Sequence, residues 1–385
     1  MKILYVTQPY FLDSDILLLE QLQKKSDTHI LFNITKGSLK STLADISKCP
    51  NKTGIYSLED FEGIEFAKDK LDVSKLKIIY RNSESFTSFE TLKSINLFTK
   101  YVKDLKPDLI HIIGIQSFDF LRFLPFCKIP IVQTLHDPVP HSSDVSLKNS
   151  LQRWMNDFFI KNKIILNRVQ LSEFIKLSKP KNVLVSRIGP YEYMQDYLAQ
   201  KSTNGSDKKI ILFFGRIEKY KGVDYLIKAF NQICKKYPDA KLLIAGRGNL
   251  YWDKTLHENN EQIEIVNKFL SMEDIANYIS SSCCVVCPYT DATQSGVLMT
   301  AFGLKTPIMA SAVGAFPDVI QNGFNGYLFP PKDVDALANV LDNYLSDKTL
   351  YETFSRNIGE SYFSGNNSWG IIVDEVLDFY KKILS

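Results

Sequence analysis

Residues 284–320 read as strand, small-residue turn and helix, and this pattern constrains the fold more than any other part of the sequence. An apolar strand around 285–286 is ended by Pro288, and an apolar helical run over 297–304 follows a turn at 294–296. Such a turn exposes backbone N–H groups at the positive end of a helix dipole, which suits a phosphate. The stretch predicts a βα unit of a parallel sheet with an anion-binding turn.

A second strand-to-helix turn lies earlier in the chain. The strand KIILFF, residues 209–214, precedes Gly215 and Arg216, and Lys221 follows just before an amphipathic helix. Two cations beside such a turn suit a dianionic group. Both turns belong to a doubly wound α/β domain, because ligands of such sheets gather at the carboxyl ends of the strands.

Together these stretches resemble the second domain of the retaining GT-B glycosyltransferases of group 1, also called glycosyltransferase family 4. The matching pieces, in the family's order, are FGRIEKYKG, LLIAGRG, PYTDATQSGVLMTAFGLKTPIMAS, VGAFPDVI and NGFNGYLFPPKD. The resemblance implies an α/β GT-B fold, in which two Rossmann-like doubly wound domains face each other across a cleft.

The domain boundaries follow from composition and from the resemblance. We expect an acceptor domain over 1–197, beginning with the buried strand at 2–6, and a polar linker over 198–208. The nucleotide-sugar domain then covers 209–365. The resemblance implies that a helix over 366–385 packs back on the first domain.

The resemblance also assigns the residues that bind the sugar-nucleotide donor. They are Gly215, Arg216, Lys221, Gly246, Asn267, Phe269, Gln294, Ser295, Gly296, Val297 and Thr300. The family usually has two glutamates eight residues apart, one just before the turn and one inside the helix after it, where this chain has Ala292 and Thr300. Asp291 can replace the first, and Thr300 can still offer one hydroxyl to a ribose. This departure bears on donor identity and on activity.

A His–Asp pair ends the strand predicted over 130–134, and the prolines after it prevent the strand from continuing. Relatives place a histidine at this strand end, close to the reacting carbon of the donor sugar. The resemblance therefore gives catalytic roles to His136, Arg216, Lys221 and Asp291, and we assign acceptor contacts to His141 and Tyr10.

We predict no metal and no cofactor beyond a sugar nucleotide of the UDP or GDP type. Cys284 and Cys287 form a C-x-x-C, but their side chains point to opposite faces of a strand and no second pair follows. The acidic triplet at 13–15 is assigned as a cap of the helix over 16–24.

Composition limits the classes of binding partner and the cellular compartment that we expect. The formal charge of +3 is too small to indicate nucleic-acid binding, and six scattered cysteines indicate a reducing, cytoplasmic protein. The segment 147–182 has eight Lys or Arg against two Asp or Glu and carries an apolar helical stripe. The favoured interpretation packs this stripe on the sheet. The alternative is peripheral contact with the inner membrane surface.

The predicted function is transfer of a sugar, with retention, to a hydroxyl of a glycan or lipid-linked acceptor. The expected context is bacterial surface polysaccharide or glycoconjugate assembly, by a monomer. Two alternatives stay open, a non-catalytic sugar-nucleotide or glycan-binding relative and a sugar-nucleotide epimerase of the same fold. Nicotinamide chemistry is disfavoured because no G-x-G-x-x-G follows a strand. The sequence names neither the donor base, the sugar, the acceptor nor the linkage.

Overall fold

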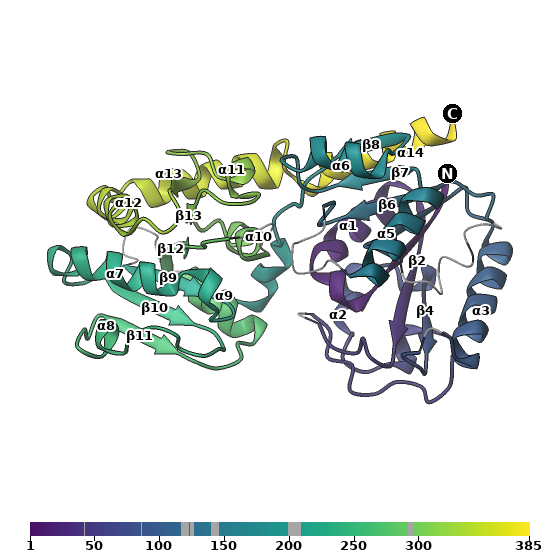
Figure 1. Ribbon diagram of the computed structural model, residues 1–385, viewed down its shortest axis with the longest axis horizontal. Coiled ribbons are helices and arrows are strands. Elements are labelled where there is room, and N and C mark those ends of the chain that lie inside the picture. The colour runs from purple at the N-terminus through teal and green to yellow at the C-terminus, as the bar shows by residue number, and fades with distance from the viewer. Residues whose placement is uncertain are drawn as a thin grey trace. The chain divides into compact units, whose positions relative to one another are not determined.

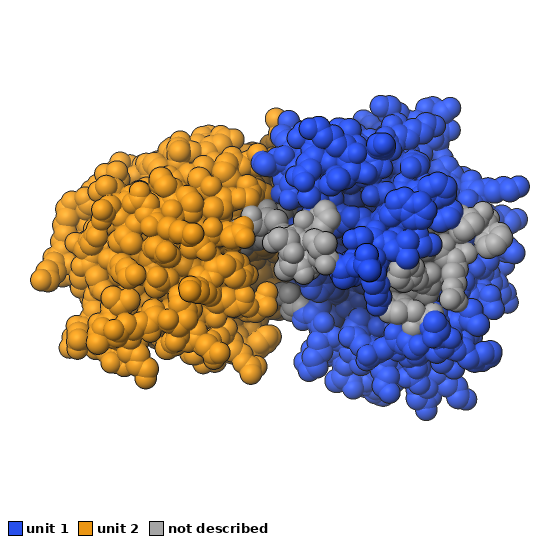
Figure 2. Space-filling view, in the orientation of Figure 1, with its two compact units in different colours: residues 1–188, 369–385 blue, residues 189–368 orange. Residues whose placement is uncertain are grey.

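The structure is a computed structural model that describes residues 1–41, 43–85, 87–116, 123, 127–139, 146–198, 209–291 and 296–385 (Figure 1). It divides into two compact units, unit 1 with residues 1–188 and 369–385, and unit 2 with residues 189–368 (Figure 2). Residues 189–197, which the sequence analysis placed in the first domain, group with unit 2. The physical reason is that the Tyr191 N–H donates to the carbonyl of Met299 at 2.9 Å.

Unit 1 contains an eight-stranded sheet in its described part, with the order β3-β4-β2-β1-β5-β6-β7-β8. All neighbours are parallel except β3 and β4, which are antiparallel. The central strands are buried on both faces, which explains their continuous apolar sequence. The strands are β1 (Lys2–Thr7), β2 (Asp27–Thr35), β3 (Gly54–Tyr56), β4 (Leu76–Arg81), β5 (Leu109–Ile113), β6 (Ile131–Leu135), β7 (Asn162–Ile165) and β8 (Asn182–Val185).

The helices that accompany this sheet are α1 (Leu12–Lys25), α2 (Phe66–Lys70), α3 (Phe89–Leu105), α5 (Leu147–Phe159), α6 (Leu171–Ser178) and α14 (Trp369–Leu384), with short 3₁₀ turns at Pro9–Phe11, Leu58–Asp60 and Val73–Lys75. Helix α1 begins earlier than predicted, and the predicted acidic cap is wrong. Asp15 lies inside the first turns of α1, buried, and accepts a 2.5 Å hydrogen bond from the Thr7 hydroxyl. The buried hydrogen bond with Thr7 in β1 therefore holds Asp15 inside the helix, where it does not cap the N-terminus.

Unit 2 has a parallel sheet with the order β11-β10-β9-β12-β13-β14. The chain winds outward from β9 in one direction and from β12 in the other, so the strand order reverses between these two strands. A doubly wound sheet binds ligands outside its carboxyl edge at this point. The strands are β9 (Ile210–Phe214), β10 (Lys241–Ala245), β11 (Ile263–Val266), β12 (Ser282–Cys287), β13 (Ile308–Ser311) and β14 (Gly326–Phe329).

The helices of unit 2 are α7 (Val223–Ile233), α8 (Thr255–Glu258), α9 (Met272–Ser281), α10 (Gly296–Gly303), α11 (Phe316–Val319), α12 (Val334–Ser346) and α13 (Leu350–Ile358), with shorter turns at Glu192–Tyr197, Lys219–Lys221, Cys234–Lys236 and Gly359–Ser364. Ser271 and Asp274 form a capping box at the start of α9. The predicted class, α/β with two Rossmann-like units, is confirmed. Within the described ranges, no helix has the length and apolar character needed to cross a bilayer.

Candidate functional site

Two loops meet at the point where the strand order of unit 2 reverses. Gly222 ends the turn after β9 with φ of 66° and precedes α7. A Cβ atom at this residue would lie 1.9 Å from the carbonyl oxygen of Pro288, in the loop after β12. Only glycine allows this contact, which brings the residues before α7 against the loop after β12.

A second close backbone approach joins β9 to β10. The N–H of Gly215 donates to the carbonyl of Ala245 at 3.0 Å, and Gly246 follows with φ of 152°. A Cβ on Gly246 would lie 1.8 Å from the carbonyl oxygen of Gly215. Gly215 and Gly246, both predicted to bind donor, thus lie together at one edge, and a side chain on Gly246 would prevent this approach.

Lys221 is a cation at this edge that has no acidic partner among the described residues. Its Nζ lies 3.8 Å from the ring centroid of Tyr289 and 5.2 Å from that of Tyr220. Burial is the main reason why the pKa of the Lys221 ammonium is lowered to about 8, and the nearby positive charge of Arg216 acts in the same direction. No carboxylate of the described residues reaches ion-pair distance. Lys221 is therefore a charge held over aromatic rings, without a neutralising anion.

Arg216 has a different environment from Lys221. Its side chain is 77% exposed and forms an ion pair with Glu218 at 3.1 Å. An exposed pair of this kind contributes little stability, so the guanidinium can leave Glu218 for a stronger anion. Arg216 and Lys221 flank the same turn, as the sequence predicted.

The loop after β12 is described on both sides of residues 292–295. Asp291 is exposed, and its neighbour Thr290 donates its N–H to the carbonyl of Tyr220 at 2.8 Å. The predicted donor residues Gln294 and Ser295, and the departure at Ala292, lie outside the described residues. Helix α10 begins at Gly296, so its first N–H groups belong to the predicted turn.

Thr300 stands where relatives have a glutamate, and its hydroxyl hydrogen already has an acceptor. Thr300 Oγ1 donates to the Gly296 carbonyl at 2.7 Å, one helical turn earlier, while Val297 is half-buried beside it. The Thr300 oxygen keeps lone pairs that can accept from a ribose hydroxyl, but it has no proton left to give.

The segment predicted to hold the nucleotide base lines a pocket of about 350 Å³. Asn267 forms its wall, accepting from the Gly248 N–H at 3.1 Å and donating to the Gly248 carbonyl at 2.9 Å. The ring of Phe269 is 78% exposed and offers a face for stacking. Arg247 also lines this pocket, and the sequence analysis missed it although it follows Gly246 directly.

In unit 1, His136 follows β6 at the carboxyl edge of the sheet. Its ring stacks on Phe11, with centroids 5.1 Å apart and planes 21° apart, and Tyr10 beside Phe11 is 74% exposed. Burial lowers the pKa of His136 to about 4, so the ring is neutral at pH 7. Its Nε2 is buried and finds no hydrogen-bond partner among the described residues. His141 lies outside them.

Behind His136 lies a group of buried ionisable side chains that the sequence analysis did not assemble. Both ring nitrogens of His111 form hydrogen bonds, one with the Thr134 hydroxyl at 2.7 Å and one with the Tyr380 hydroxyl. Burial lowers the pKa of His111 to about 3. Burial raises the pKa of Asp15 to about 8. Asp15, His111 and His136 line a cavity of about 30 Å³, enough for one water.

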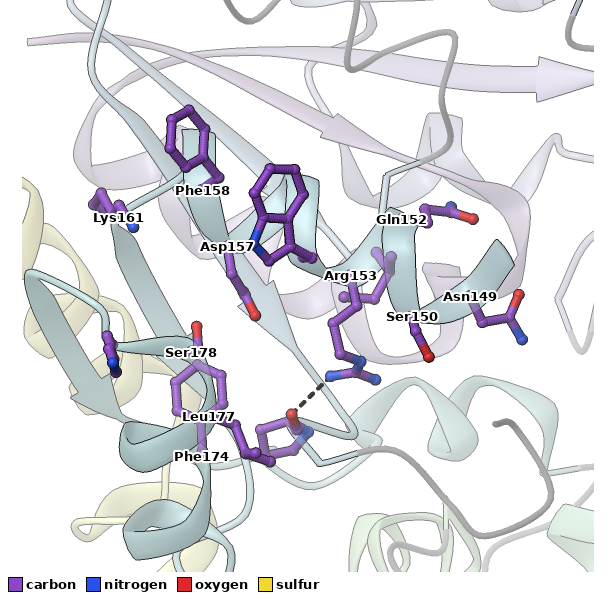
Figure 3. Close-up of a pocket in the computed structure, with 14 residues that line it drawn as sticks. Asn149, Ser150, Gln152, Arg153, Asp157, Phe158, Lys161, Phe174, Leu177 and Ser178 are labelled. Atoms are coloured by element: carbon purple, nitrogen blue, oxygen red, sulfur yellow. Dashed lines mark hydrogen bonds between the residues drawn. The ribbon is translucent and has the colours of Figure 1, made fainter. Parts of the chain in front are cut away.

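The larger cavity of unit 1 is a groove of about 760 Å³ between α5 and α6 (Figure 3). The favoured prediction that the apolar stripe of α5 packs on the sheet is wrong for most of it. Leu147, Leu151, Trp154 and Phe158 are 93%, 51%, 60% and 56% exposed. Within the described part of the chain, no three His, Cys, Asp or Glu side chains cluster as metal ligands do.

The family model described as glycosyl transferases group 1 matches residues 194–360. An uncharacterized glycosyltransferase of Methanocaldococcus jannaschii is 28% identical over 52% of this chain and 53% of its own length. The N-acetyl-alpha-D-glucosaminyl L-malate synthase of Bacillus anthracis is 27% identical over 64% of this chain and 66% of its own length. The chain thus spans less than two thirds of either relative.

Solved structures match along nearly the whole chain. HepE of Anabaena in complex with UDP aligns with a TM-score of 0.68 at 15% identity, covering 99% of this chain and 100% of its own. The UDP-GlcNAc 2-epimerase of Neisseria meningitidis, bound to UDP-GlcNAc, aligns with a TM-score of 0.62 at 13% identity, covering 99% and 100%. At such identities the likeness shows the fold alone. The family model, the curated relatives and this fold together support a group 1 glycosyltransferase of the GT-B type.

Proposed function

We propose that this protein transfers a sugar from a nucleotide-diphosphate donor to a hydroxyl of a glycan or lipid-linked acceptor. The observation that carries the proposal is Lys221, an ammonium held 3.8 Å from the Tyr289 ring at the carboxyl edge of the unit 2 sheet. A diphosphate supplies the anion that this site lacks. The UDP found in the Anabaena structure, which has the same fold, is a ligand of this chemistry.

The chemistry follows from charge. As the donor sugar leaves, negative charge grows on the diphosphate, and Lys221, Arg216 and the first N–H groups of α10 oppose it. Preorganised donors of this kind are each worth about 3 kcal/mol in a transition state. We propose that the departing phosphate takes the acceptor proton on the same face, which gives retention without a carboxylate nucleophile and without a metal.

His136, Asp291 and Tyr10 complete the proposal. A neutral His136, with its buried Nε2 free to bond, can orient the donor sugar near the reacting carbon. Asp291 is exposed in the loop after β12, where it can contact the sugar in place of the family's glutamate. The exposed ring of Tyr10 is assigned to the acceptor, as is His141 by its sequence position.

The proposed setting is the cytoplasm, at the inner face of a membrane where surface polysaccharide or glycoconjugate is assembled, by a monomer. The six cysteines are all free thiols, which supports a reducing compartment. The exposed apolar stripe of α5 supports contact with the membrane surface.

The test is a calorimetric panel with UDP, GDP, ADP, dTDP and CMP on the wild type and on Arg216→Ala/Lys221→Ala. We expect one diphosphate to bind and the double variant to lose about 100-fold in affinity, since each charged hydrogen bond contributes about 1.5 kcal/mol. Lys228→Ala is the matched control, because Lys228 lies on α7 and pairs with Asp224 at 3.5 Å. Absence of binding by every nucleotide would overturn the proposal.

A non-catalytic nucleotide-binding relative is the second candidate, favoured by Thr300. Its hydroxyl hydrogen is committed to Gly296, so the ribose loses the carboxylate that relatives provide. Product analysis distinguishes the candidates, since the transferase releases free nucleotide only with acceptor and keeps the anomeric configuration. An epimerase instead converts the sugar nucleotide without acceptor, and a binding protein does neither.

A further inference from the structure

Helix α5 carries an apolar stripe that faces solvent. Leu147, Leu151, Trp154 and Phe158 follow one another at spacings of four, three and four, which places them within about 60° around the helix axis. Between 51% and 93% of each side chain is exposed. The rings of Trp154 and Phe158 stack on each other, with centroids 5.5 Å apart. Exposed patches of this kind mark binding surfaces in soluble domains.

The stripe is not needed to hold α5 on the sheet, because a different face does so. Asn156 is buried and joins α5 to the segment after β5, accepting from the Gln116 N–H and donating to the Gln116 carbonyl, both at 2.9 Å. Met155 and Phe159 pack against the apolar core of the sheet. Asn156 lies roughly 160° around the helix from the stripe. The exposed stripe is therefore a second apolar face.

A groove beside the stripe extends this surface to α6. Its walls include Phe158 and Lys161 on one side and Phe174 and Leu177 on the other (Figure 3). Leu177 is 62% exposed. The Lys161 ammonium lies 5.9 Å from the centroid of the Phe158 ring, so apolar and cationic groups alternate along the groove.

The segment that carries the apolar groups has an excess of positive charge. Of the eight cations and two acids in 147–182, Lys163 and Asp157 neutralise each other in a buried pair at 2.8 Å. By sequence, the segment then has seven other cations and one other acid, Glu173. The seven cations are Lys148, Arg153, Lys161, Arg168, Lys176, Lys179 and Lys181. Except for Arg153, which is half-buried, these side chains are exposed.

We propose that α5 and α6 bind the surface of a bilayer that contains anionic lipid. The stripe of α5 enters the boundary between headgroups and acyl chains, while the surrounding cations meet lipid phosphates. Indole and phenyl rings together with long basic side chains suit this boundary, since both have an apolar body and a polar or charged end. A protein partner of ordinary composition would not select so large an excess of one charge.

The proposal deepens the membrane contact named under the proposed function, but it does not require sugar transfer. Vesicle binding is measured without nucleotide or acceptor, so its failure leaves the diphosphate site untouched. Equally, loss of nucleotide binding leaves the α5 and α6 surface untouched.

Trp154 provides a direct spectroscopic test. The chain has three tryptophans, and Trp252 and Trp369 are buried at 8% and 5% exposure. Adding vesicles of phosphatidylglycerol with phosphatidylcholine should shift the emission to the blue and protect it from aqueous quenchers. Lipids brominated near the headgroup should quench it. An unchanged spectrum with such vesicles would overturn the proposal.

Variants locate the surface. Co-sedimentation measures the affinity for the same vesicles. It should fall at least about tenfold in Trp154→Ser/Phe158→Ser. It should fall about 100-fold in Lys161→Gln/Lys176→Gln/Lys179→Gln, since each cation contributes about fivefold. The matched controls lie on α3, where Phe89 and Leu92 are 76% and 47% exposed. Phe89→Ser/Leu92→Ser and Lys93→Gln/Lys100→Gln/Lys103→Gln should bind as the wild type does.

Three outcomes would contradict the proposal. Equal loss in the α3 variants would place the contact elsewhere. If binding survives in Trp154→Ser/Phe158→Ser, electrostatic attraction to the anionic lipid alone accounts for it, and the apolar stripe does not enter the bilayer. Self-association without lipid that disappears in that variant, measured by analytical ultracentrifugation, would assign the stripe to a second copy of the chain. Unchanged circular dichroism and unfolding midpoints confirm that each variant is folded.

Discussion

The carboxyl edges of the two sheets both carry ionisable side chains, but they differ in how those side chains are solvated. In unit 2, Arg216 is exposed and Lys221, with a pKa of about 8, is about half charged at pH 8. In unit 1, His136 and His111 have pKa values of about 4 and 3, and Asp15 has one of about 8. Unit 2 thus presents charge to a ligand, whereas unit 1 keeps its ionisable groups neutral. The first arrangement suits an anionic ligand, and the second suits a neutral sugar.

The largest expected effect concerns the backbone contact that builds the unit 2 edge. Gly246→Ala should lower the free energy of unfolding by at least about 4 kcal/mol, because the new Cβ would lie 1.8 Å from the Gly215 carbonyl oxygen. Urea unfolding measures this. Gly370→Ala, where no atom lies within 4 Å of the added Cβ, is the control and should leave stability nearly unchanged. Equal stability of the two variants would show that the unit 2 edge is not close-packed.

The next effect concerns the neutral groups of unit 1. The pKa of Asp15 is raised from 3.8 to about 8 in the folded state, so the stability that its proton contributes is complete below pH 3.8 and disappears as pH rises through 8. Between pH 6.5 and 8 this removes about 2 kcal/mol, at about 1.4 kcal/mol per pH unit. Asp15→Asn should abolish that part of the decline in urea unfolding. Asp104→Asn, exposed on α3, should retain it.

A smaller effect tests the charge of unit 2. Raising the pH from 7 to 9 should weaken diphosphate binding about tenfold, because the charged fraction of a Lys221 with a pKa of about 8 falls by that factor. Lys221→Arg should give a flat profile over this range, since arginine stays protonated. Calorimetry at three pH values is sufficient. A decline of the same size in Lys221→Arg would assign it to another group.

The smallest effect concerns the aromatic contact on His136. Phe11→Ala should raise the pKa of His136 by less than about 1, because water would reach one face of the ring. The chain has five histidines, few enough for NMR titration of each ring. His111, bonded through both nitrogens, serves as the internal reference and should not change. If His136 keeps its pKa, Phe11 is not what excludes water from it.

The sequence predicted most of this architecture because long apolar runs and capping residues act locally. Helix α3 is an example of such a local signal, because the Ser88 side chain caps its first turn. No strand was predicted for β4, since it begins at the end of the weakly patterned region 36–79 and Lys77 interrupts its apolar run. Its partner β3 is three residues long and half-buried, which leaves almost no periodic signal.

The candidate site was predictable where one turn carries it and unpredictable where distant segments meet. A single strand precedes Arg216, Lys221 and the adjacent glycines, so the sequence alone predicted that these residues lie together. The stacking of Phe11 on His136 and the bond between His111 and Tyr380 join residues far apart in the chain, and no local pattern encodes them. For α5, helical periodicity revealed an apolar stripe, but it could not say that Met155 and Phe159, and not Trp154 and Phe158, would meet the sheet.

Because of helix α14, the two units can complete their folding at different times during synthesis. Unit 2 is one continuous stretch of chain, whereas unit 1 requires residues 369–385, which follow unit 2 in the sequence. Tyr380 in α14 supplies a bond to His111 in β5, and Glu375 pairs with Arg187 at 2.8 Å. On the ribosome, the part of the chain made first therefore cannot complete its core until the last helix has emerged. Unit 2 can fold earlier. Until α14 has been made, the core of unit 1 is incomplete and its apolar residues can bind a chaperone.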